Sequence, residues 1–197
     1  MENRIAFFDF DGTITRKDTM LEFIRHSKGS VRFYTGFLLN SPWLIAYKLG
    51  LLPNQTAKER ILTHFFKGTP LTVFQEECDQ FCLDVLPGLV RPGALPEIEK
   101  LQQADISVVI VSASLGNWIK TWSDGKKTAL LASWPEIRDG RLTGKLQGKN
   151  CYGEEKVKRI QASYALQDYT DIYAYGDTSG DLPMLSLARF TFFKPFR

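Results

Sequence analysis

The 197-residue sequence has few cysteines and few histidines. Its three cysteines, Cys78, Cys82 and Cys151, form no CxxC pair, and the chain contains only two histidines. A disulfide framework and the usual zinc sites are therefore excluded, and this cysteine usage is typical of a reducing compartment. Cys78 and Cys82 lie four residues apart on a predicted helix, where we expect both to be small core residues.

A membrane-spanning run and an export signal are also missing. The most apolar stretch, residues 31–52, contains an uncharged run of only fifteen residues between Arg32 and Lys48. A helix that crosses a bilayer needs about 20 apolar residues, so this run is too short to span one. The N-terminus has neither the apolar segment nor the small-residue cleavage site of a signal peptide. We therefore expect a cytoplasmic protein.

The charge is mild and evenly spread. The formal net charge is +3 at pH 7, and the basic residues are dispersed rather than clustered. This pattern argues against a nucleic-acid partner. The length allows one sizeable core and a small accessory unit, so we expect one catalytic domain with an insertion.

Aromatic and aliphatic side chains crowd residues 31–52, and they have two interpretations. They either form the core of a small helical domain or leave an apolar face for a lipid-like substrate or a membrane surface. The sequence therefore leaves open a peripheral contact with lipid through this region.

The most informative pattern lies in residues 5–15. An apolar run that is broken at Gly12 predicts a buried strand that ends at a turn. Asp9 and Asp11 are two residues apart, so an extended backbone points both carboxylates to the same side. Their like charges are compatible with a cation between them or with one protonated acid, as in phosphoryl chemistry. The alternative is that both residues only cap a turn.

The remaining chain divides into a helical part and an alternating part. Residues 13–90 show helical periodicity throughout, with Thr19 and Glu22 as a candidate capping box. Strands are predicted at residues 106–111, 130–134, 171–175 and 190–193, with a hairpin at Asp139-Gly140. We therefore predict an α/β fold: a doubly wound parallel sheet from residues 1–12 and 91–197, with residues 13–90 as an all-helical cap.

Polar residues fall at one predicted edge of this sheet. Ser112 follows the second strand, Lys156 opens a helix, and Asp177 and Asp181 follow the strand at 171–175. The helix dipole disfavours a cation in the first turn, so Lys156 needs an external anion. Each residue also has an ordinary interpretation, namely a helix cap for Ser112 and Asp181 and a solvated surface side chain for Lys156.

Taken in order, these segments resemble the four motifs of the haloacid dehalogenase superfamily. The segments are Asp-Phe-Asp-Gly-Thr at residues 9–13, Ser112, Lys156, and Gly-Asp-Thr-Ser-Gly-Asp at residues 176–181. The helical insertion stands where the phosphoserine phosphatase-like branch keeps its cap. The resemblance implies a Rossmann-like phosphatase that acts on a small phosphorylated substrate.

The resemblance also implies a role for each residue. Asp9 would attack phosphorus and form an aspartyl phosphate, and Asp11 would act as general acid and then as general base. Mg²⁺ would be held by the Asp9 carboxylate, the Asp11 backbone carbonyl and Asp177.

The other motif residues would bind the substrate. By the same resemblance, Ser112, Ala113 and Lys156 would hold the phosphoryl group, and Asp181 would orient the metal site or Lys156. Asp18 matches the acidic cap residue that recognises the amino group of phosphoserine, but it is a shorter acid.

Two further departures from the family motifs concern the pocket that would bind the serine part of phosphoserine. Gly180 replaces the asparagine of the fourth motif, and Ala113 and Ser114 replace a glycine pair. Phosphoserine and a lipid phosphate such as phosphatidylglycerophosphate therefore remain rival substrates, together with another small phosphomonoester. A phospho-aspartate signalling module and a membrane-surface binder that uses residues 31–52 are the alternatives of other classes.

Overall fold

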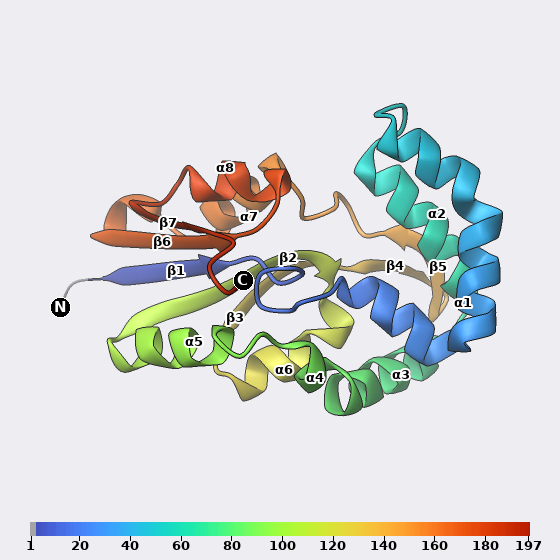
Figure 1. The fold of residues 1–197 in the computed structure, drawn as a ribbon, viewed down its shortest axis with the longest axis horizontal. Helices are drawn as coiled ribbons and strands as arrows, with labels where there is room; N and C mark the ends of the chain where they lie inside the picture. The colour runs from blue at the N-terminus through green and yellow to red at the C-terminus, as the bar shows by residue number, and fades with distance from the viewer. Residues whose placement is uncertain (1–2) are drawn as a thin grey trace.

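A five-stranded parallel sheet forms the centre of the larger part of the molecule. The computed structural model describes residues 3–197 and contains a five-stranded sheet in the order β3-β2-β1-β6-β7 (Figure 1). Helices cover both faces of the sheet (Figure 1). The five strands are β1 (Arg4–Phe8), β2 (Ile106–Leu115), β3 (Ala129–Ser133), β6 (Asp171–Gly176) and β7 (Phe190–Phe193). The predicted doubly wound α/β fold is therefore confirmed.

The central strand β1 is buried on both faces. It pairs in parallel with β2 on one side and with β6 on the other. Ala6 and Phe8 join the core cluster on one face of the sheet, and Ile5 and Phe7 join the cluster on the opposite face. Alternate residues of a strand point to opposite faces, so a continuous apolar run is what a strand covered on both sides requires.

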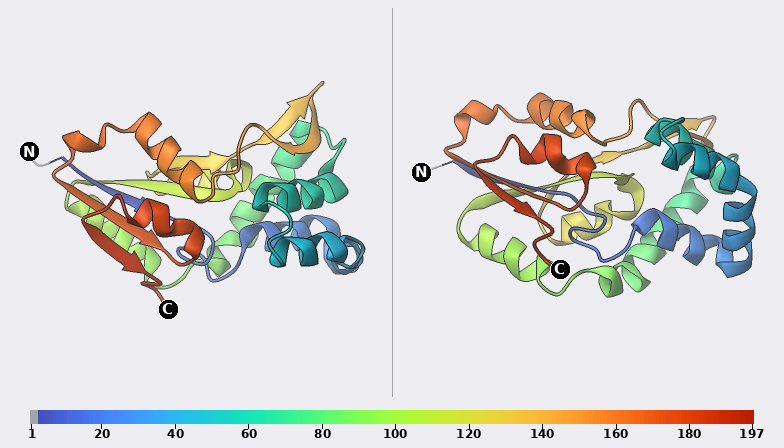
Figure 2. Two further views of the ribbon diagram at one scale, coloured as in Figure 1. Left: turned by 90° about the horizontal axis from the view of Figure 1, so that it is seen from above. Right: turned by 45° about the horizontal axis from the view of Figure 1, so that its top comes forward.

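Four of the five helices between β1 and β2 lie in residues 13–90, the predicted cap. They are α1 (Thr19–Lys48), α2 (Asn54–Phe66), α3 (Leu71–Asp84) and α4 (Leu86–Leu89). Helix α1 is broken at Gly29, whose φ of 76° lies in the left-handed region that glycine adopts without strain. Figures 1 and 2 show that the part of α1 after this break runs along the edge of the cap.

The start of α1 differs from the predicted capping box. Asp18, not Thr19, is the N-cap, and its Oδ1 accepts a hydrogen bond from the Leu21 N–H at 3.1 Å. The Thr19 hydroxyl faces the core instead, where the indole of Trp118 donates to it at 3.0 Å. The buried indole needs an acceptor, and this tertiary contact takes the hydroxyl away from the helix end.

The helices of the sheet domain are shorter than those of the cap. They are α5 (Ala94–Gln103), α6 (Lys120–Gly125), α7 (Glu154–Ser163) and α8 (Leu182–Leu185), with 3₁₀ turns at Gly116–Trp118, Leu166–Asp168 and Ser179–Asp181. The helix that contains Lys156, α7, ends at Ser163. Tyr164 is extended there, and its ring packs edge-on against Phe7 with centroids 5.8 Å apart.

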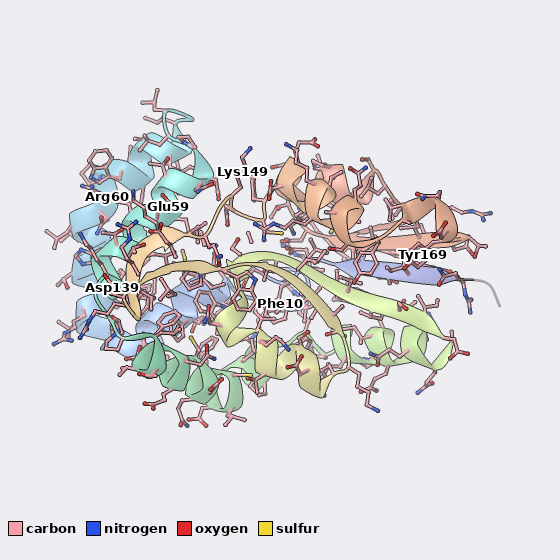
Figure 3. All side chains as sticks on the ribbon, turned by 180° about the vertical axis from the view of Figure 1, so that it is seen from behind. Phe10, Glu59, Arg60, Asp139, Lys149 and Tyr169 are labelled. Carbon is pink, nitrogen blue, oxygen red and sulfur yellow. The ribbon has the colours of Figure 1, made fainter. Side chains whose placement is uncertain are left out.

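The predicted hairpin is present, and it packs on the cap. Strands β4 (Pro135–Arg138) and β5 (Arg141–Leu146) are antiparallel, and Asp139 and Gly140 both have positive φ. Leu142 exchanges backbone hydrogen bonds with Gly68 and Thr69, which follow α2. Figure 3 shows Asp139 of the hairpin on the same side of the molecule as Glu59 and Arg60 of α2. The predicted cap, residues 13–90, is thus helical, and the hairpin β4–β5 from the second part of the chain packs against it.

An aromatic cluster joins the cap to the sheet domain. The Phe23 ring lies about 5 Å, centroid to centroid, from four other rings, those of Phe66, Phe74, Phe81 and Trp118. Cys78 and Cys82 are buried and free, as predicted for small core residues, and Cys151 is buried and free as well. Among residues 3–197 the structure has no helix that is both long enough and apolar enough to cross a membrane.

We predict that Phe23→Ala destabilises the protein by about 3–5 kcal/mol, because it leaves a cavity among five packed rings. Urea unfolding monitored by tryptophan fluorescence measures this change in the free energy of unfolding. Tyr34→Ala is the matched control, since the Tyr34 side chain is 64% exposed and should change stability by less than about 0.5 kcal/mol. An equal loss in the two variants would contradict this description of the core.

Candidate active site

Asp9 follows β1 directly and is held in place by two donors. Its backbone N–H continues the pairing of β1 with β6 by donating to the Tyr175 carbonyl at 2.9 Å. Its Oδ1 accepts from Lys156 Nζ at 2.6 Å, and its Oδ2 accepts from the Thr13 hydroxyl at 3.0 Å. The carboxylate is buried and has one fixed orientation at the carboxyl edge of the sheet.

Lys156 lies in the first turn of α7 and is 1% exposed. Besides Asp9, its ammonium contacts Asp181 Oδ1 at 2.7 Å. The other oxygen of Asp181 accepts from the backbone N–H groups of Asp177 and Thr178 and from the Thr178 hydroxyl. The anion that Lys156 needs is thus supplied by two carboxylates, which excludes the surface-lysine interpretation.

Burial and these ion pairs act against each other on the pKa values. Burial raises the pKa of Asp9 to about 7, although the Lys156 ammonium opposes the rise. Burial lowers the pKa of Lys156, but Asp9 and Asp181 outweigh it and keep this pKa above its usual value. Burial also raises the pKa of Asp181, but Lys156 and the two N–H donors hold it below its usual value. Lys156 and Asp181 are therefore a charged pair, and Asp9 needs further positive charge to stay ionised.

Asp177 completes a cluster of three buried acids. Side-chain oxygens of Asp9, Asp177 and Asp181 lie within 4.8 Å of one another. Arg197 donates to Asp177 Oδ2, and burial together with Asp181 raises the Asp177 pKa. A Cβ on Gly12 would lie 2.4 Å from this same oxygen, so only glycine lets the turn approach Asp177. Carboxylate oxygens at this spacing fit Mg²⁺, a hard cation that prefers oxygen ligands.

Asp11 and Asp18 lie on the cap side of Asp9. The Asp11 carboxylate is not a member of the buried acid cluster; its Oδ1 accepts from the Thr19 N–H at 2.6 Å. Both residues line the cavity that Asp9 also lines. Asp18 in addition caps α1, so part of its hydrogen-bonding capacity is used within the helix.

Ser112 lies behind the wall of the cavity rather than in it. Its hydroxyl is buried and accepts from the Ser114 N–H at 3.0 Å, while Ala113 and Ser114 form the wall of the cavity. Strand β2 continues past Ser112 to Leu115, with an irregularity in its pairing to β3. The irregularity brings backbone groups of this segment to the cavity.

The cavity has a volume of about 310 Å³ and two unlike ends. The polar end is formed by Asp9, Asp11, Lys156 and Asp181. The other end is apolar and comes entirely from the cap, through Met20, Leu21, Phe37, Leu44, Ala57 and Ile61. Enclosed pockets with a few fixed polar groups at one end are typical of small-molecule sites.

Sequence reasoning missed Lys58 of α2. Its Nζ donates to the Ala113 carbonyl and lies 3.4 Å from Asn150 Oδ1, so it joins the cap to the sheet domain. Burial lowers the pKa of Lys58 to about 8, although Asp11 and Asp18 oppose this change. The only signal in the sequence is a lysine beside the apolar stripe of a helix, and surface lysines share that signal.

Tyr152 was also missed, and it explains one departure from the family motif. A Cβ on Gly180 would lie 2.2 Å from the Tyr152 ring, so the glycine at this position makes room for the tyrosine. Tyr152 lines the cavity beside Thr178. A side chain at position 180 would require the Tyr152 ring to move.

Fold and site together define a class of protein. Asp9 and Asp177 follow the neighbouring strands β1 and β6, where the strand order reverses, which is where open α/β sheets bind ligands. A buried carboxylate, a fixed ammonium and a cluster of three acids that could hold a metal at one pocket fit a hydrolase that acts on an anionic ester. This chain belongs to the haloacid dehalogenase-like hydrolases, whose family model matches residues 6–186.

Comparisons with single proteins agree with this assignment. The chain is 33% identical over 199 residues to protein CicA of Caulobacter vibrioides, covering 100% of this chain and 88% of that protein. It is 26% identical over 192 residues to phosphoserine phosphatase of Wolinella succinogenes, covering 94% and 84%. A protein of unknown function from Bordetella pertussis shares the fold with a TM-score of 0.82 at 23% identity, covering 97% and 89%. The predicted family, its phosphoserine phosphatase-like branch and the enzyme class, a phosphatase, are confirmed.

We predict that Gly12→Ala weakens Mg²⁺ binding at least about tenfold, because the new methyl group would displace the Asp177 carboxylate. Isothermal titration with MgCl₂ measures the affinity. Gly148→Ala is the matched control, since Gly148 also has a positive φ but nothing lies within 4 Å of its added Cβ. Both variants carry the same backbone strain, so equal Mg²⁺ affinities would show that Asp177 does not hold the metal.

Proposed function

We propose that this protein is a Mg²⁺-dependent phosphomonoester hydrolase that acts through an aspartyl phosphate on Asp9, as a phosphoserine phosphatase does. The observation that carries the proposal is the buried Asp9 carboxylate, which is fixed by Lys156 and Thr13 at the polar end of a lidded cavity. A carboxylate so placed is oriented as a nucleophile toward whatever anion enters the cavity.

Charge is the main obstacle to this reaction. A phosphate monoester is a dianion, so it repels an attacking carboxylate unless fixed cations cancel the repulsion. The Lys156 ammonium supplies one of these cations. Mg²⁺, when held by the carboxylates of Asp9 and Asp177 and the Asp11 backbone carbonyl, supplies the further positive charge that stabilises both the Asp9 carboxylate and the phosphoryl group. Asp181 keeps Lys156 charged and in position.

Asp11 is proposed to move the proton. In the first step an Asp9 oxygen bonds to phosphorus, the bond to the ester oxygen breaks, and Asp11 gives its proton to that oxygen. In the second step Asp11 takes a proton from water, and the water oxygen attacks phosphorus. Phosphate leaves, and the Asp9 carboxylate is regenerated. The hydrogen bond from Thr19 N–H to Asp11 holds this acid at the cavity wall.

The phosphoryl group is proposed to sit against β2. Lys156 Nζ would donate to its oxygens from one side, and Ser112 with the backbone at Ala113 would support the other. The hydrogen bond from Ser114 N–H to the Ser112 hydroxyl orders this segment for such a role.

The apolar end of the cavity favours a second candidate substrate, a lipid phosphate. Phosphoserine is polar throughout, and it would leave Phe37, Leu44 and Ile61 without an apolar partner. An alkyl or acyl group would fill this end, while Asp18 and Lys58 would remain for the polar part of the substrate. Comparing kcat/KM for phosphoserine with that for a lysophosphatidate separates the two substrates.

A signalling role for the aspartyl phosphate is less well supported. Signalling modules of the receiver type keep the phosphoryl group on the acid, whereas Asp11 stands where it would speed hydrolysis. A phosphorylated state that lasts for minutes in the presence of Mg²⁺ would favour that role over the phosphatase.

We predict that Asp9→Asn lowers turnover of p-nitrophenyl phosphate with Mg²⁺ by about 10⁴-fold or more, because the amide cannot attack phosphorus. Asp11→Asn should also be slow, and mass spectrometry after acid quenching should show one phosphoryl group on its Asp9 peptide. Asp18→Asn is the control of matched charge, and it should retain turnover of this aryl ester. Substantial turnover by Asp9→Asn would refute the assigned nucleophile.

A pH dependence follows from Lys58. Its pKa of about 8 means that the ammonium is charged below pH 8 and becomes neutral above it. If Lys58 binds an anionic group of the substrate, kcat/KM should fall as the pH rises through 8.

Lys58→Met should abolish this fall and lower kcat/KM by about tenfold to a hundredfold at pH 7, with kcat less affected. Initial rates between pH 6 and about 9.5 measure the profile. A profile that is the same in the wild type and in Lys58→Met would remove Lys58 from substrate binding.

A further inference from the structure

The part of α1 after Gly29 exposes an apolar stripe to solvent. Residues at helical spacing, Val31, Tyr34, Leu38, Pro42, Ile45 and Leu49, are all exposed, and none of them is charged. Leu38 is 73% exposed and Leu49 is 69% exposed. Figures 1 and 2 show no helix or strand on the outer side of this segment. We call these six residues the outer stripe.

The opposite face of the same helix is apolar as well, but it is covered. Phe33 and Phe37 pack against the core, and Phe37, Leu44 and Tyr47 line the apolar end of the cavity. A helix with two apolar faces is usually covered by other groups on both of them. The inner face has its partners within the chain, so the outer stripe is the side that lacks one.

The charge around the outer stripe indicates which partner fits it. No acidic residue occurs between Glu22 and Glu59, whereas this interval contains Arg25, Lys28, Arg32, Lys48 and Lys58. Lys28 pairs with Glu77, and Lys58 lies at the cavity. Among the ion pairs of residues 3–197, none involves Arg25, Arg32 or Lys48. Arg32 and Lys48 lie near the two ends of the outer stripe.

We propose that the outer stripe docks on an anionic phospholipid surface. Apolar side chains would enter the boundary between headgroups and acyl chains, and Arg32 and Lys48 would contact anionic headgroups. A second copy of this chain fits less well. If two outer stripes met, Arg32 and Lys48 of one copy would lie against the same cations of the other and repel them. The run is too short to span a bilayer, so the helix would lie along the surface.

This placement has a consequence for the cavity. The helix that would touch the lipid with one face lines the apolar end of the cavity with the other. An apolar substituent of a phosphomonoester would therefore have its binding site one helix thickness from the lipid surface. Docking is measured without turnover, so its failure and the failure of the proposed phosphatase activity are separate results.

Vesicle flotation tests the proposal with the full chain. The wild type should float with vesicles of phosphatidylcholine and phosphatidylglycerol at about 3:1, and bind about tenfold less to phosphatidylcholine alone. Leu38→Gln with Ile45→Gln should lower binding to the mixed vesicles by about tenfold or more, because both side chains would leave the apolar boundary. Arg32→Gln with Lys48→Gln should remove the preference for anionic vesicles.

Leu83→Gln is the matched control, because Leu83 is a 68% exposed leucine on α3 and should bind like the wild type. Circular dichroism shows that each variant is folded. The proposal is overturned if the wild type fails to float, or if the Leu38 and Ile45 double variant floats equally well. It is also overturned if light scattering shows a dimer that this double variant dissociates, since the stripe would then join two copies.

Discussion

The site depends on one buried ammonium that stands between two carboxylates. Lys156 Nζ contacts Asp9 at 2.6 Å and Asp181 at 2.7 Å, and the three side chains come from a helix start, a strand end and a 3₁₀ turn. A buried charge without partners would be strongly destabilising, so removing any of the three leaves the others uncompensated. The triad therefore fixes how β1, α7 and the loop after β6 meet. In the proposed reaction the same fixed charge would let an acid face a phosphate.

The cap adds a second set of side chains to the cavity beside Asp9 and Lys156. Its Asp18 lies at the polar end beside Asp11 of the sheet domain, and its helices supply nearly all of the apolar lining. Lys58 reaches from α2 to the backbone of β2, and the hairpin β4–β5 supports α2 from the other side. The residues proposed to react and those proposed to select a substrate thus lie largely on different parts of the chain. A change in the cap residues can alter the substrate while Asp9, Lys156 and Asp181 keep their contacts.

Local sequence patterns predict the strands and the hairpin of the sheet domain well, because apolar runs and turn residues specify these elements. The apolar run of β1 and the β-branched run of β2 predict their strands, and Asp139-Gly140 predicts its hairpin. Thr19 was misjudged as a cap because its hydroxyl is claimed by Trp118, a residue 99 positions away. Lys58 escaped for the same reason, since its partners, Ala113 and Asn150, are distant in sequence. The order of motifs predicts which acids and which lysine gather, but the lining of the cavity depends on packing that no local pattern records.

The central claim is that Asp9 is the residue that receives the phosphoryl group. A crystal structure of the wild-type protein grown with Mg²⁺ and beryllium trifluoride, a mimic of the phosphoryl group, tests this claim most directly. We predict that beryllium is bonded to a carboxylate oxygen of Asp9, that Lys156 donates to a fluoride, and that the metal is ligated by Asp9 and Asp177. Beryllium bonded to another side chain, or a metal that lies away from Asp177, would contradict it.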